Sequence, residues 1–145
     1  MGLFDWIFGK KSVVDSLKNE HKKIISIYSK IVKLMEKEKF DRLPKHLKEF
    51  YYTYSRHILY EDNYFYSKLR KIYSHDKNKQ LFIKLKREEM DEITKFIEKF
   101  INKFKTHHDI RENFEEFKKE IQVIGEVLSA RVKFEESELY PLYNV

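Results

Sequence analysis

The chain has 145 residues, enough for one domain with a buried core, and its formal net charge is +6. It contains no cysteine, which excludes disulfides, thiolate nucleophiles and cysteine-bound zinc and fits a cytoplasmic location. Basic and acidic residues interleave without forming a basic stripe, so we expect no nucleic-acid partner. With only three Gly and two Pro, the sequence predicts an all-α fold.

Residues 1–11 (MGLFDWIFGKK) form an apolar N-terminal arm, which precedes a helical domain over residues 12–145. The arm is too short to span a bilayer and lacks the layout of a signal peptide, so we expect no membrane span. We expect the arm to pack across the end of the helical domain. The alternative is a surface for a partner, a membrane interface or self-association, made by the side chains of Leu3, Phe4, Trp6, Ile7 and Phe8.

The first two predicted helices, residues 13–37 and 44–73, each carry an apolar stripe at helical spacing. In the first helix, the stripe that includes His21 consists of Val14, Leu17, His21, Ile24, Tyr28, Ile31 and Met35. In the second helix, His57 and Glu61 lie on the stripe one turn apart, after Leu47, Phe50 and Tyr54. These polar residues therefore face the core.

Two further helices are predicted at residues 79–105 and 110–140. Met90 lies on the inner face of the third helix, and Arg131 and Glu135 lie on that of the fourth. The connections are short, so neighbouring helices should be antiparallel and form an up-down-up-down four-helix bundle. In such a bundle, inward-facing residues at matching depth meet in one layer of the core.

The two halves of the chain repeat one pattern, but histidine occurs in it only in the first half. There, EHKKI (residues 20–24) precedes HILYE (residues 57–61). In the second half, EMDEI (residues 89–93) precedes RVKFE (residues 131–135). Imidazole nitrogens and carboxylate oxygens are common ligands of iron, zinc and manganese. The first half therefore carries a candidate set of metal ligands.

These motifs resemble those of the hemerythrin-like, or HHE cation-binding, domains over roughly residues 12–143. The resemblance implies a four-helix bundle in which two irons share bridging carboxylates, and the corresponding residues here are Glu61 and Glu135. One iron would take its nitrogen ligands from the first two helices, at His21 and His57. The positions that supply nitrogen to the second iron hold Met90 and Arg131 instead, so the resemblance implies a partly lost di-iron site.

We interpret Arg131 as a fixed cation at the place of the second metal. Two buried carboxylates without a nearby cation would be costly, and a guanidinium can bond a carboxylate through two N–H groups. Met90 would fill apolar volume, because a thioether is a poor ligand for iron. We therefore predict at most one non-haem metal per chain. Iron is the first choice and zinc or manganese the alternatives, with the ligands His21, His57, Glu61 and Glu135.

Three functions are compatible with the sequence. The first is a single-metal site that binds a cation or senses O₂ or NO. The second is a metal-free structural or interaction module in which the old site is a salt-bridged core. The third is a di-iron O₂-binding site rebuilt with a substitute ligand such as Glu89. We expect no enzyme, because the chain has no Gly-rich phosphate loop, nucleophile elbow or cysteine.

Overall fold

The computed structural model describes the backbone of residues 3–143 and the side chains of residues 13–143. Within these residues all regular secondary structure is helical and there is no strand, so the predicted all-α class is confirmed. None of the helices in the described part of the chain is long and apolar enough to cross a membrane.

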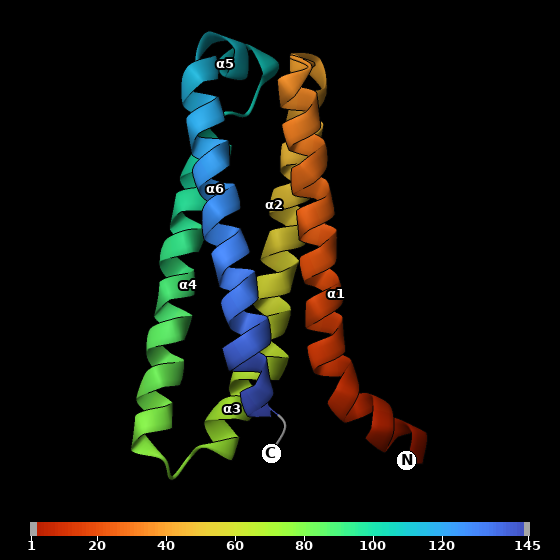
Figure 1. The fold of residues 1–145 in the computed structure, drawn as a ribbon, viewed down its shortest axis with the longest axis vertical. Helices are drawn as coiled ribbons and strands as arrows, with labels where there is room; N and C mark the ends of the chain where they lie inside the picture. The colour runs from red at the N-terminus through yellow and green to blue at the C-terminus, as the bar shows by residue number, and fades with distance from the viewer. Residues whose placement is uncertain (1–2, 144–145) are drawn as a thin grey trace.

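Four long helices lie side by side and alternate in direction along the chain (Figure 1). They are α1 (Leu3–Glu36), α2 (Leu43–Tyr60), α4 (Lys77–Lys103) and α6 (Phe114–Phe134). In Figure 1, α1 and α4 run upward while α2 and α6 run downward. Inward-facing residues from helices of both directions can therefore meet at one depth, as the sequence predicts.

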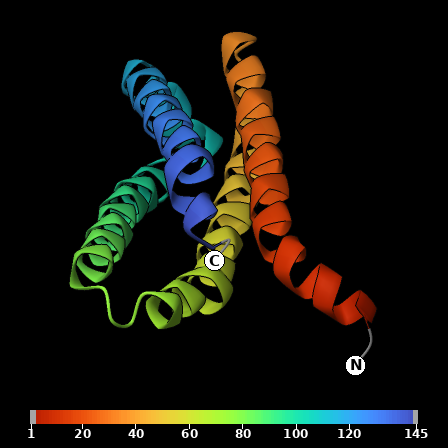
Figure 2. The same cartoon turned by 60° about the horizontal axis from the view of Figure 1, so that its bottom comes forward.

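α1 begins at Leu3, ten residues before the predicted start at residue 13. Residues 3–12 contain no proline, and the single Gly9 costs a helix only about 1 kcal/mol, so nothing in this segment stops the helix. Figure 2 shows the first turns of α1 diverging from the other helices rather than crossing their ends. The side chains of the apolar segment Leu3–Phe8 lie outside the described residues, and their role as a partner surface stays a prediction.

The predicted second and fourth helices are both interrupted. Each contains a π-helical turn, in which one extra residue is inserted into the helical repeat. On the second, α2 continues into the π turn η2 (Glu61–Tyr66) and then α3 (Ser67–Ile72). On the fourth, the short α5 (His107–Glu112) precedes α6, which continues into the π turn η3 (Glu135–Leu139) and the 3₁₀ turn η4 (Tyr140–Tyr143). A further 3₁₀ turn, η1 (Phe40–Arg42), links α1 to α2.

A layer of charged and polar side chains divides the apolar core into two clusters. The larger cluster extends toward α5 and includes Ile24, Tyr54, Met90, Phe117 and Leu128. The smaller cluster, near α3, consists of Val13, Leu17, Phe65, Tyr66, Leu69, Ile83, Leu139, Tyr140 and Tyr143. Between them along the helices lie the buried polar residues of the described chain, His21, His57, Glu61, Arg131 and Glu135. We call these five residues the polar layer.

The larger cluster is held by an aromatic group in which Phe117 contacts Phe100 and Phe104, with ring centroids 5.4 and 5.2 Å apart. Because Phe117 is fully buried, Phe117→Ala should lower the free energy of unfolding by about 3–5 kcal/mol in denaturant titration. The control is Tyr52→Ala, whose side chain is 63% exposed and whose loss should change stability by only about 0.5 kcal/mol. Equal losses for the two variants would contradict the described core.

Candidate metal centre

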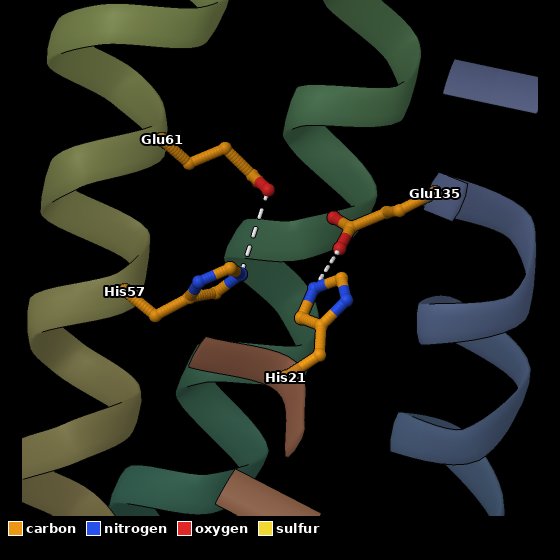
Figure 3. Close-up of side chains that lie close together, drawn as sticks. All are labelled: His21, His57, Glu61 and Glu135. Atoms are coloured by element: carbon orange, nitrogen blue, oxygen red, sulfur yellow. Dashed lines mark ion pairs between the residues drawn. The ribbon is translucent and has the colours of Figure 1, made fainter. Parts of the chain in front are cut away.

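Four side chains of the polar layer converge from separate helical segments (Figure 3). His21 comes from α1, His57 from α2, Glu61 from η2 and Glu135 from η3. One nitrogen or oxygen atom from each lies within 4.8 Å of the corresponding atoms of the other three. His21 Nε2 is 2.9 Å from Glu135 Oε1, and His57 Nε2 is 3.5 Å from Glu61 Oε2. The structure thus brings together all four residues that the sequence predicted as ligands.

Both carboxylates stand at the first position of a π-helical turn. Glu61 opens η2 and Glu135 opens η3, so the two halves of the chain share this departure from regular helix. In a π helix, residues i and i+5 lie on the same face. Tyr66 follows Glu61 by five residues and Tyr140 follows Glu135 by five, so both tyrosines also reach the polar layer.

These two tyrosines were missed from the sequence because the α-helical repeat of 3.6 residues does not place them beside the glutamates. The spacing Glu-x₄-Tyr recurs in both halves and was the signal available. π turns of this kind are often found at functional sites.

Each histidine also bonds a second glutamate through its Nδ1 atom, on the side of the ring away from the centre. His57 Nδ1 lies 2.8 Å from Glu20 Oε1, and His21 Nδ1 lies 2.7 Å from Glu136 Oε2. When Nδ1–H donates to a carboxylate, Nε2 is left to face the centre, and this is how metal-binding histidines are usually oriented. Glu20 and Glu136 were not among the predicted site residues. Their position directly beside His21 and Glu135 in the sequence was the available signal.

Arg131 is buried beside the carboxylates, as predicted for a fixed cation. Its Nε donates to Glu135 Oε2 at 3.0 Å, and its Nη2 donates to Tyr66 Oη at 2.9 Å. The contact with Glu135 is a single hydrogen bond rather than the expected two-pronged one. Nη1 lies 3.7 Å from Glu89 Oε2 and has no hydrogen-bond partner among the described residues.

Met90 and Glu89 are the two other positions of the second half for which the sequence suggested a role. Met90 is buried and packs in the larger apolar cluster, consistent with a space-filling role. Glu89 is half exposed and accepts from Lys86 Nζ at 3.2 Å, outside the group of four ligands. The structure therefore offers no support for Glu89 as a substitute ligand.

Burial and neighbouring charges shift the pKa values of residues in the polar layer in different directions. Burial disfavours the charged form of His57, but hydrogen bonds to its two carboxylate partners outweigh burial and raise its pKa to about 10. Burial and then repulsion from Glu135 raise the pKa of Glu61. Burial would also raise the pKa of Glu135, but hydrogen bonding with His21 and the charge of Arg131 lower it. Without metal, the layer therefore holds imidazolium and guanidinium cations against its carboxylates.

A cavity of about 270 Å³ lies beside the site, and three of the four candidate ligands, His21, His57 and Glu135, form part of its wall. The rest of the wall is mainly apolar and includes Tyr28, which crosses α6 at Gly125 and donates to the carbonyl of Ile121 at 2.8 Å. A Cβ at position 125 would overlap the Tyr28 hydroxyl, so glycine is required for this close approach. Since a water molecule occupies about 30 Å³, the cavity has room for a small molecule beside the site.

Arg131→Ala in the metal-free protein should lower the free energy of unfolding by about 3–5 kcal/mol, because it leaves the buried Glu135 without its guanidinium partner. The measurement is denaturant unfolding in the presence of a chelator. Arg56→Ala is the control, since Arg56 is exposed and lies over the ring of Tyr52, and its loss should cost about 0.5 kcal/mol or less. Equal costs would exclude the charge-replacement role of Arg131.

The raised pKa of His57 predicts that the metal-free protein loses stability in mild alkali. Its folded pKa of about 10 lies above the ordinary value of 6.5, so the stabilisation is complete below about pH 6.5 and is lost toward pH 10. The free energy of unfolding should fall between pH 7 and 9 with a slope approaching 1.4 kcal/mol per pH unit, roughly. His57→Gln should flatten this slope, and the same slope in both proteins would contradict the described electrostatics.

The chain matches a known protein family. The family model for the hemerythrin HHE cation binding domain matches residues 12–143. No curated protein and no solved structure matches the chain. The family match covers nearly the whole sequence and includes every residue of the buried His/Glu group that could hold a metal. The resemblance in the sequence motifs is thus confirmed, and the chain belongs to the hemerythrin-like, HHE cation-binding, domain family.

Proposed function

We propose that this domain is a hemerythrin-like up-down four-helix bundle that binds a single non-haem metal ion, iron first, with zinc or manganese as alternatives. The ligands are His21, His57, Glu61 and Glu135. The observation that carries the proposal is the orientation of the two imidazoles. Each is anchored at Nδ1 by an outer carboxylate, and each Nε2 faces the carboxylates of the polar layer.

The limit of one metal follows from the second half of the site. The position equivalent to His57 is Arg131, whose guanidinium bonds Glu135 and carries a permanent positive charge. The position equivalent to His21 is Met90, which packs in the apolar core. A second cation beside Arg131 would meet charge repulsion and find no nitrogen ligand there.

A bound metal has to displace the proton held by His57, whose pKa is about 10 in the metal-free protein, so binding should release protons. Two imidazoles and two carboxylates suit a non-haem ferrous ion that keeps positions open for a small ligand such as O₂ or NO. The mainly apolar cavity beside the site supports access by such a ligand. We propose a role in cytoplasmic metal binding or in O₂ or NO sensing, without catalytic turnover.

A second candidate function, a metal-free structural or interaction module, is favoured by one specific observation. The buried charges already have protein partners, because Arg131 bonds Glu135 and the hydroxyl of Tyr140 lies 2.8 Å from Glu61 Oε2. A polar layer with its charges paired in this way can hold the helices together without a metal. Metal analysis separates the two candidates.

Protein purified without chelator and loaded anaerobically with Fe(II) should bind at most one iron per chain, measured by metal analysis after desalting. His21→Ala and His57→Ala should each reduce the bound iron at least about tenfold, because loss of a ligand removes more affinity than loss of an outer partner does. His108→Ala is the control, since His108 is exposed in α5 and should leave iron binding unchanged.

The double variant Met90→His, Arg131→His tests the limit of one metal, because it restores both nitrogen ligands that a second iron would need. Its iron content should rise toward two per chain. Two irons in the unaltered protein would refute the single-metal proposal. No bound metal, with no shift in melting temperature on adding Fe(II) or Zn(II), would favour the interaction module. The segment Leu3–Phe8 would then be the first surface to test for a partner.

A further inference from the structure

The hydroxyl of Tyr140 lies among the candidate ligands themselves. Its Oη is 2.8 Å from Glu61 Oε2, 3.2 Å from Glu135 Oε1 and 3.1 Å from His21 Nε2. The residue is buried, and its ring stacks on that of His21 at 17° with centroids 5.6 Å apart. One phenol oxygen thus contacts donor atoms of three of the four predicted ligands.

The single hydroxyl proton of Tyr140 cannot bond both carboxylates fully at the same time. Tyr140 can donate to only one acceptor at a time, yet two carboxylate oxygens lie within hydrogen-bond distance of it. A cation among these atoms would attract all of them together. Two donor atoms bound to one metal at about 2.1 Å and at right angles are about 3.0 Å apart, and the three distances from Tyr140 Oη fall around this value.

The other half of the chain shows what the equivalent tyrosine does. Tyr66 occupies the same position after Glu61 that Tyr140 occupies after Glu135. Its oxygen accepts a hydrogen bond from Arg131 Nη2 at 2.9 Å, so it faces the fixed cation of the second half. Tyr140 faces the histidine-bearing half, where the proposed cation is the metal.

We propose that Tyr140 is a fifth metal ligand and that it binds ferric iron as a phenolate. This inference rests on the proposed single-metal function. The Fe–O bond replaces the O–H bond, and the proton leaves with the others displaced by metal binding. An anionic oxygen ligand favours Fe(III) over Fe(II), so Tyr140 would bias the site toward the ferric state.

The test is optical. The protein is loaded anaerobically with Fe(II) and oxidised with ferricyanide, which takes one electron from each iron. After desalting, the ferric protein should show a visible phenolate-to-iron charge-transfer band. Resonance Raman excitation in that band should show phenolate ring modes that shift when the protein is made with ring-deuterated tyrosine. Tyr140→Phe should lose the band while it keeps the same iron content.

Tyr66→Phe is the matched control, since it removes the equivalent hydroxyl from the arginine side and should retain the band. The deuterium shift needs no substitution, so it shows that a tyrosine binds the iron even where Tyr140→Phe does not fold. Retention of the band by Tyr66→Phe then leaves Tyr140, whose hydroxyl contacts three of the four predicted ligands, as that tyrosine. Iron bound to the unaltered protein without the band, or a band that persists in Tyr140→Phe, overturns the ligand role and leaves the metal site standing. No iron bound to the unaltered protein overturns both proposals together.

Discussion

The organisation of this domain depends on the burial of two carboxylates. Glu61 and Glu135 are 1% and 2% exposed and lie between two apolar clusters, where an isolated negative charge is costly. Positive charge must therefore be supplied beside them from within the core. The structure supplies it as the imidazolium of His57 and the guanidinium of Arg131. The helices are positioned so that these groups meet at one depth.

Each half of the chain places a different cation beside its buried glutamate, His57 in the first half and Arg131 in the second. In the first half, Glu20 from α1 supports His57 on α2. In the second half, Glu89 from α4 lies near Arg131 on α6, in the same place in the repeated pattern, at the longer distance of 3.7 Å. A permanently charged arginine needs an outer acid less than histidine does, because its protonation does not depend on a partner. The looser contact of Glu89 is consistent with this difference.

Helical periodicity was sufficient to predict the all-α class and the members of the polar layer. His21, His57 and Arg131 were found because they lie on α-helical stripes of apolar residues, and burial is what those stripes report. The contribution of Tyr140 could not be found in this way, since it depends on a π turn that begins at Glu135. The predicted start of the first helix at residue 13 was also wrong, because residues 3–12 contain no proline and the helix continues through them.

Because an arginine stands where the second metal would bind, the stability of the domain should depend little on whether metal is bound. In a site with two exchangeable metals, loss of both would leave buried carboxylates with no fixed positive charge nearby. Here Arg131 bonds Glu135 without any metal, and the raised pKa of His57 keeps its imidazole protonated in the metal-free protein. The proposed metal would therefore exchange with a proton and leave the helices in place. Such a domain can bind and release one metal ion and stay folded when the ion leaves.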